Sequence, residues 1–359
     1  MRHLARLTGA LLLIPLLHCG SGSDGSPGGD GAPASSSTDP SSPASPPGSP
    51  ANPPPATPGD PGKPSGAMSD PAKDGPYAGQ EVDAVAKVAA TGDDVPVHVA
   101  FPTTGNGPFP VVVVAHGFQL PASQYYGYVK RLATFGYVAL TADYPAGFFS
   151  KSNVKDAQNL SGALDWALAA PQLAGKVDAA KAGVMGHSRG GKGAVLAAAA
   201  DARFKAVLGL DPVDSGSPLG CDAKTECPDA SDAMKSLAIP SAFLGELTDA
   251  KGASFGQACA PDKDNFATFY TSAKSSLSVT VKDANHMSFL DDPSSCGATC
   301  SVCNAAKAPH ADVLGLAYAM TVAFFERNLR GVTAADDYLT GATAKSRYVA
   351  TGLATIQSK

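Results

Sequence analysis

The chain has 359 residues, a net charge of −5 and only 27 lysine and arginine residues, so it offers no basic surface for a phosphate backbone, and we expect no nucleic-acid partner. Glycine and proline are concentrated between residues 19 and 76, where small and polar residues dominate. The remaining stretch of roughly 260 residues has a globular composition and fits one α/β domain. Past residue 20, no apolar run is long enough to form a transmembrane helix.

The N-terminus resembles an export signal. In residues 1–18, two arginines precede an apolar block, which ends in a Leu-Leu-His-Cys sequence at Cys19. This ending resembles the lipobox of bacterial lipoproteins, in which the cysteine becomes the lipidated first residue. We therefore expect a lipid on Cys19 that anchors the protein to the bacterial cell envelope, at the outer membrane or cell surface, with residues 19–76 as a disordered tether. An ordinary signal peptide that is cleaved elsewhere is the alternative.

From residue 82 onward, short β-branched runs alternate with helical patterns, which is typical of a mostly parallel sheet covered by helices on both faces. Strands are expected at 82–89, 95–101, 111–115, 137–142, 182–185, 204–210, 239–245 and 277–281. Helices are expected at 123–134, 154–169, 190–200, 265–273 and 309–329. The alternation at 95–101 indicates a position near an antiparallel edge, whereas the continuous run at 111–115 indicates a strand buried on both faces. The expected domain covers 77–335, with an irregular insertion at 221–236 and a C-terminal tail at 336–359.

A sharp turn between a strand and a helix is predicted around Ser188. The sequence Gly186-His187-Ser188-Arg189-Gly190 matches G-x-S-x-G, in which the glycines let the strand and helix backbones approach closely. A second match is centred on Ser254, but no strand runs directly into it and no helix follows. We therefore predict Ser188 as a nucleophile and interpret Ser254 as a loop serine.

A serine nucleophile needs a base, and in this arrangement the chain order is serine, acid, histidine. Only His286 and His310 lie beyond a plausible acid. His286 follows the strand at 277–281 in a loop from which its ring can reach Ser188, whereas His310 begins a helix and is better explained as a surface cap. The pattern therefore favours His286 as the base.

Four carboxylates are candidates for the acid that orients the histidine: Asp211, Asp214, Glu246 and Asp249. All four follow predicted strands at their carboxyl ends, where sites form in open α/β sheets. The pattern alone leaves all four open.

The reaction also requires two backbone N–H groups that stabilise an oxyanion. Arg189, directly after the nucleophile, supplies the first. The loop after the strand at 111–115 supplies the second, with Phe118 preferred and Gln119 as the alternative.

Six cysteines lie beyond Cys19, and in an oxidising compartment they predict three disulfides without fixing their connectivity. They are Cys221, Cys227, Cys259, Cys296, Cys300 and Cys303. The last three suggest a zinc site, but no second pair with histidine lies nearby, so we expect no metal. A redox role for the Cys-x-x-Cys pair that ends at Cys303 lacks the βαβ context of redox domains.

Several stretches together resemble the chlorophyllase branch of the α/β-hydrolase superfamily, which is similar to platelet-activating-factor acetylhydrolases and bacterial polyester hydrolases. They are His116-Gly117-Phe118 and the segments at 135–139, 186–192, 204–214, 259–261 and 286–292. The resemblance implies the α/β-hydrolase fold, and its Asp-Pro-Val context implies Asp211 as the acid. Residues 215–235 depart from the family pattern, and we expect them to help wall the pocket.

The resemblance implies a serine carboxylesterase that hydrolyses apolar esters through Ser188, His286 and Asp211, with no cofactor, and the N-terminal signal adds the expectation that it is exported. The substrate would be a small-molecule or lipid-like ester. A lipase or polyester hydrolase with the same triad is one alternative. A non-catalytic surface-binding lipoprotein is an alternative of another class, because fold does not imply function.

Overall fold

The computed structural model describes residues 68–252 and 258–359, which belong to one compact unit. The predicted signal peptide, the lipidation site at Cys19, most of the tether and Ser254 lie outside the described residues. Within the described part of the chain, no helix is long and apolar enough to cross a membrane.

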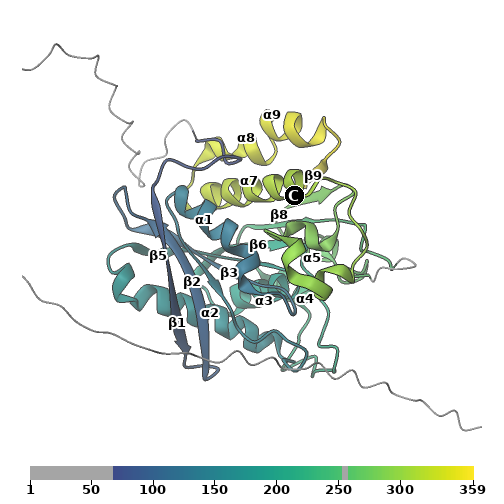
Figure 1. Cartoon of the computed structure of the whole chain (residues 1–359), viewed down its shortest axis with the longest axis horizontal. Helices are drawn as coiled ribbons and strands as arrows, with labels where there is room; N and C mark the ends of the chain where they lie inside the picture. Colours follow the sequence, from purple (N-terminus) through teal and green to yellow (C-terminus); the bar gives the residue numbers. More distant parts are fainter. Residues whose placement is uncertain (1–67, 253–257) are drawn as a thin grey trace, which may run out of the picture. The chain divides into compact units, whose positions relative to one another are not determined.

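The described residues form a nine-stranded sheet in the order β1-β2-β4-β3-β5-β6-β7-β8-β9 (Figure 1). The six strands from β4 to β8 in this order run parallel, and β1, β2 and β9 are antiparallel at the two edges. This confirms the predicted α/β-hydrolase fold and the antiparallel setting of the second strand. The strands are β1 (Gly79–Val88), β2 (Asp93–Pro102), β3 (Phe109–Ala115), β4 (Val138–Ala142), β5 (Val177–His187), β6 (Phe204–Leu210), β7 (Ser241–Gly245), β8 (Ser276–Val281) and β9 (Ala354–Ser358).

Helices cover both faces of the sheet (Figure 1), and β3 shows why its sequence is continuously apolar. Val112 and Val114 pack into the core formed with α1 and α7, whereas Val111 and Val113 pack on the opposite face with α2 and α3. Alternate side chains of a strand point to opposite faces, so both must be apolar here. The helices are α1 (Tyr126–Thr134), α2 (Asn153–Ala169), α3 (Arg189–Ala200), α4 (Ala230–Ser236), α5 (Phe266–Ser272), α6 (Gly297–Ser301), α7 (His310–Leu329), α8 (Asp336–Leu339) and α9 (Ala342–Ala344).

The structure differs from the sequence prediction in three segments. The expected irregular insertion contains α4, whose first amides donate to the Asp214 carboxylate. The expected C-terminal tail contains β9, which pairs with β8 and extends the sheet. The last part of the expected tether lies against the domain, because Asp70 forms an ion pair with Arg347 at 2.7 Å. Each of these elements depends on a long-range contact that local periodicity does not reveal.

The six cysteines beyond Cys19 form three disulfides, which confirms the predicted number of pairs. The pairs are Cys221–Cys227, Cys259–Cys303 and Cys296–Cys300. The second pair joins segments that are 44 residues apart, on either side of the loop that contains His286.

The parallel strands β5, β6, β7 and β8 end at the same edge of the sheet. The loops that follow them contain Ser188, Asp211, Asp249 and His286, respectively. The topology therefore brings these side chains together, although they are spread over about 100 residues of sequence.

Candidate active site

Ser188 occupies the turn between β5 and α3 in a backbone conformation that is rare for residues with a side chain. Its φ is 55° and its ψ is −125°. A Cβ on Gly186 would collide with the backbone of Gly190, and a Cβ on Gly190 would collide with the backbone of β3 and His116. The two glycines are therefore required by the close approach of strand and helix, and the strained turn presents the serine at the end of the sheet.

The His286 ring contacts Asp211. Its Nδ1 lies 2.6 Å from the Asp211 Oδ2 atom, and both side chains are buried. His286 begins the short 3₁₀ turn His286–Phe289, which is fixed by reciprocal hydrogen bonds between Asn285 and Ser288. His286 and Ser188 line the same cavity of about 490 Å³. The structure thus brings together the predicted nucleophile, base and acid.

The other three candidate acids have different partners. Asp214 pairs with the buried Lys192 at 3.1 Å and also binds the first turn of α4. Glu246 accepts the backbone N–H of Asp249 at 2.9 Å. Asp249 accepts the backbone N–H of His286 at 2.7 Å. Of these four carboxylates, Asp211 is the one that bonds to the imidazole ring.

The protonation of the His286–Asp211 pair is compatible with His286 acting as a base. Burial lowers the pKa of His286, so the ring is neutral near pH 7. A neutral ring that donates its Nδ1 proton to Asp211 leaves Nε2 as an acceptor for a proton from Ser188. Burial raises the pKa of Asp211, and the hydrogen bond from the Glu246 backbone N–H opposes this shift.

The two residues predicted to supply the oxyanion amides both lie at the cavity. Phe118 and Arg189 line the cavity beside Ser188. Arg189 is the first residue of α3, where a backbone N–H has no partner within the helix. The Gln119 N–H donates to the Ala146 carbonyl at 3.0 Å, so it is already engaged and Phe118 is the better donor.

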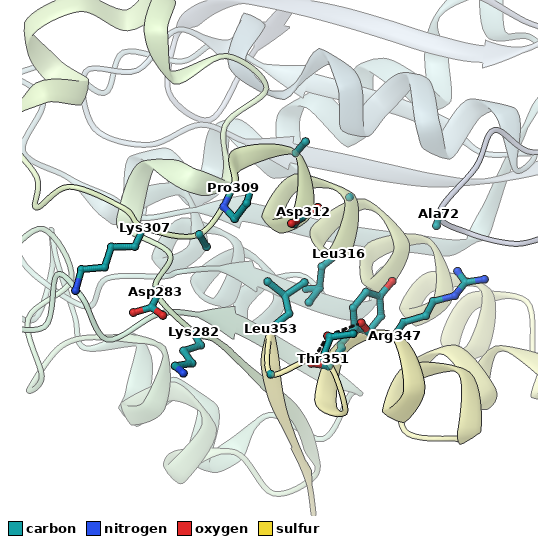
Figure 2. Close-up of a pocket in the computed structure, with 15 residues that line it drawn as sticks. Ala72, Lys282, Asp283, Lys307, Pro309, Asp312, Leu316, Arg347, Thr351 and Leu353 are labelled. Atoms are coloured by element: carbon teal, nitrogen blue, oxygen red, sulfur yellow. Dashed lines mark hydrogen bonds between the residues drawn. The ribbon is translucent and has the colours of Figure 1, made fainter.

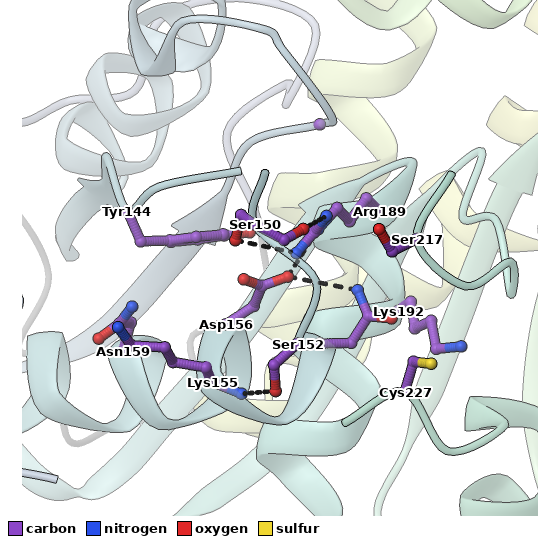
Figure 3. A network of polar contacts seen from close by, with 12 residues as sticks. Tyr144, Ser150, Ser152, Lys155, Asp156, Asn159, Arg189, Lys192, Ser217 and Cys227 are labelled. Carbon is purple, nitrogen blue, oxygen red and sulfur yellow. Dashed lines mark hydrogen bonds and ion pairs between the residues drawn. The ribbon is translucent and has the colours of Figure 1, made fainter. Parts of the chain in front are cut away.

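The side chain of Arg189 joins a buried polar network with residues of α2 and of the loop after β4 (Figure 3). Its Nε donates to Asp156 on α2 at 2.7 Å, and its Nη1 donates to the Ser150 carbonyl at 2.8 Å. The guanidinium therefore fastens the residue after the nucleophile to α2 and to the loop after β4. Sequence reasoning assigned no role to Asp156, because on a helix face it looks like any polar residue.

His310 is placed away from the base position. Its Nε2 lies 2.7 Å from the Leu290 carbonyl, at the start of α7. Among the described residues the helix has no side-chain cap, so the predicted capping role of His310 is wrong, and its ring instead binds the backbone before α7.

Two further features carry no catalytic group. A cavity of about 610 Å³ lies between the end of β8, the start of α7 and residues 347–353 (Figure 2), and Ser188 and His286 do not line it. Asp249, Cys259 and Cys303 lie close enough together to suggest a metal site. The two cysteines form a disulfide, which leaves no thiolate to bind a metal.

The family model described as chlorophyllase matches residues 69–350. The chain is 32% identical over 170 residues to a bis(hydroxyethyl) terephthalate hydrolase of Streptomyces coelicolor, a match that covers 44% of this chain and 54% of that protein. It is 29% identical over 218 residues to chlorophyllase-1 of Arabidopsis thaliana, which covers 56% of this chain and 65% of that protein. The chain thus spans less than two thirds of the length of these relatives.

Proposed function

Since the chain belongs to the chlorophyllase family of α/β-hydrolases, we propose that it is a serine carboxylic-ester hydrolase that acts on apolar esters. The observation that carries the proposal is the cavity shared by Ser188 and His286, with the His286 ring bonded to Asp211. The similarity to a terephthalate ester hydrolase and to a chlorophyllase supports ester hydrolysis as the reaction.

In the proposed mechanism, the Ser188 Oγ attacks the ester carbonyl while His286 Nε2 takes its proton. The N–H groups of Phe118 and Arg189 stabilise the tetrahedral oxyanion. His286 then returns the proton to the leaving alcohol, and the acyl group stays on Ser188. Water, activated by the same histidine, attacks the acyl-enzyme and releases the acid. Asp211 holds the imidazole tautomer and stabilises the imidazolium, and no step requires a cofactor.

The cavity wall supports an apolar substrate. Leu120, Val213, Met287 and Val302 line it, together with Pro218 from the stretch that departs from the family pattern. The only cationic side chain in this described lining is that of Arg189, and its guanidinium is already bonded to Asp156 and Ser150. A neutral ester with a bulky apolar arm is therefore favoured over a substrate with a free carboxylate, and a chlorophyll-type phytyl ester is one candidate.

A lipase or polyester hydrolase would use the same three residues and differ in substrate range. A non-catalytic binding lipoprotein is the alternative of another class, and the complete set of catalytic groups argues against it. We further propose export and a lipid anchor at Cys19, which rest on the N-terminal sequence pattern. Radiolabelled palmitate incorporated into the wild-type chain but absent from Cys19→Ala would support the anchor, and equal labelling of both would contradict it.

The test of the activity is hydrolysis of p-nitrophenyl acetate, butyrate and palmitate, a terephthalate ester and a chlorophyll ester by the full chain in detergent. Ser188→Ala is expected to abolish turnover, whereas Ser254→Ala is expected to leave it unchanged. Asp211→Asn is expected to lower kcat by as much as about 10⁴, because it favours the wrong imidazole tautomer. Absence of turnover on all five esters, or equal turnover in Ser188→Ala, would overturn the proposal.

A further inference from the structure

His187, the residue before the nucleophile, is fully buried and bonded at both ring nitrogens. Its Nε2 lies 2.9 Å from the backbone carbonyl of His286, and its Nδ1 lies 2.8 Å from the hydroxyl of Tyr125. A carbonyl oxygen can only accept, so the Nε2 of His187 carries the proton and Nδ1 accepts from Tyr125. Burial lowers the pKa of His187, which agrees with a neutral ring that holds one proton.

The Tyr125 hydroxyl continues this chain of hydrogen bonds to the oxyanion loop. It accepts the backbone N–H of Gly117 at 3.2 Å while it donates to His187. Tyr125 has no exposed surface, so water does not compete for these bonds. Gly117 directly precedes Phe118, the proposed oxyanion donor. Three hydrogen bonds therefore connect the loop after β3 to the loop after β8.

His286 is hydrogen-bonded at its backbone N–H, its backbone carbonyl and its ring. Its carbonyl accepts from His187, its N–H donates to Asp249 at 2.7 Å, and its ring is bonded to Asp211. The rings of His187 and His286 also pack against each other, with centroids 4.5 Å apart. The backbone of His286 is thus fixed at both polar groups, and the residues that fix it, His187 and Asp249, do not line the cavity.

We propose that His187 and Tyr125 are positioning residues that set the distance between the oxyanion donor at Phe118 and the base His286. This inference rests on the proposed esterase function. The tetrahedral intermediate needs the donor on one side and the base on the other, and small misplacements of such groups are costly. Because neither side chain contacts the substrate, their loss lowers kcat and leaves KM nearly unchanged.

The experiment compares kcat and KM for p-nitrophenyl butyrate in the full-length wild type, Tyr125→Phe, His187→Leu and His187→Gln. Tyr125→Phe removes one hydroxyl and is expected to lower kcat about tenfold, and His187→Leu, which breaks both bonds, about 100-fold. His187→Gln keeps a donor and an acceptor and is expected to recover part of the loss. Tyr137→Phe, which removes another fully buried hydroxyl next to Glu326 and Arg330, is the matched control and is expected to match the wild type.

Thermal unfolding and a fluorophosphonate titration of active serine are run on each variant, so that kcat is counted per folded, competent molecule. Wild-type kcat in both Tyr125→Phe and His187→Leu would overturn the inference, as would a rise in KM at constant kcat. An equal loss in Tyr137→Phe would also overturn it, because the effect would then be general to buried hydroxyls. An inactive wild type would overturn the esterase proposal and this inference together, whereas an active wild type with active variants would overturn the inference alone.

Discussion

Glu246 is a buried carboxyl beside Asp211 and Asp249. Its replacement by glutamine is expected to change both the free energy of unfolding and the pH at which activity is lost on the alkaline side. Its side chain has no exposed surface, its backbone N–H donates to Asp211 at 3.3 Å, and its Oε2 accepts from Asp249. Its Oε1 has no hydrogen-bond partner among the described residues. Burial, followed by the charge of Asp211, raises the pKa of Glu246 to about 9, while the hydrogen bond from the Asp249 backbone N–H and the nearby His286 oppose the shift.

The magnitude follows from proton linkage. The pKa of Glu246 rises from an ordinary value of 4.5 to about 9 on folding, so the folded state binds the proton more tightly. The folded chain is therefore most stable with respect to this group below pH 4.5 and loses stability as the pH rises toward 9. At pH 7, some 2.5 units above the ordinary value, keeping the carboxyl neutral costs about 3 kcal/mol. Glu246→Gln is neutral at every pH and removes this cost.

Urea unfolding at pH 4.5 and pH 7 measures the stability effect, and the variant is expected to gain up to about 3 kcal/mol at pH 7 relative to its difference at pH 4.5. The pH profile of kcat/KM measures the effect on activity. The wild type is expected to lose activity as Glu246 ionises beside Asp211, about twofold at pH 9 and about tenfold at pH 10, and the variant is expected to keep it. Glu81→Gln on β1 is the control for the loss of a distant carboxylate. The same alkaline limb in wild type and Glu246→Gln, or a stability difference that does not change with pH, would refute the reasoning.

Three further substitutions probe the surroundings of the site. Phe149, which is 86% exposed on the loop after β4, is expected to contact long apolar ester arms, so Phe149→Ala should lower kcat/KM for p-nitrophenyl palmitate several-fold but not for the acetate. Val85→Ala on β1, which truncates another exposed apolar side chain, is the control and is expected to change neither value. Asp156→Asn leaves the buried Arg189 guanidinium without its counter-ion and is expected to lower the free energy of unfolding in urea by about 3–5 kcal/mol. A loss below about 1 kcal/mol would contradict a stabilising role for this buried ion pair. Cys259→Ser opens the disulfide to Cys303 and is expected to lower the free energy of unfolding by about 2–4 kcal/mol in urea unfolding without reductant. With dithiothreitol, which opens all three disulfides in both proteins, the difference between wild type and variant is expected to shrink, and an unchanged difference would contradict the role of this disulfide.

Sequence reasoning was most informative where chemistry restricts the backbone. The sharp turn around Ser188 was predictable because only glycine fits at residues 186 and 190, where strand and helix backbones approach closely. The strand β3 was predictable because it is buried on both faces and its sequence is therefore continuously apolar. The choice of acid was not predictable from spacing. Asp211 reaches the ring through a backbone turn with a φ of 41°, and nothing in the local sequence indicates which of four carboxylates turns that way. Family resemblance supplied that choice.

The supporting residues escaped sequence reasoning for a different physical reason. His187 ends a buried strand, Tyr125 precedes an amphipathic helix and Asp156 lies on a helix, so each fits its local pattern without any functional role. Their roles appear only when hydrogen bonds join segments that are far apart in the chain, such as His187 and His286, which are separated by 99 positions in the sequence. β9 was missed likewise, because a short, partly exposed edge strand has a weak pattern and is defined mainly by its partner β8.

Two aspartates bind His286, and each binds a different part of the residue. Asp211 follows β6 and bonds to the ring, whereas Asp249 follows β7 and bonds to the backbone. Both oxygens of Asp249 are engaged, one by the N–H of His286 and the other by the N–H of Asn304 at 2.6 Å. If the Asp249 carboxylate turned toward the His286 ring, the buried backbone amides of His286 and Asn304 would lose their acceptors, at a cost of about 1–3 kcal/mol each. The Asp249 carboxylate therefore fixes the loop through two backbone amides, and it is not free to replace Asp211 at the His286 ring.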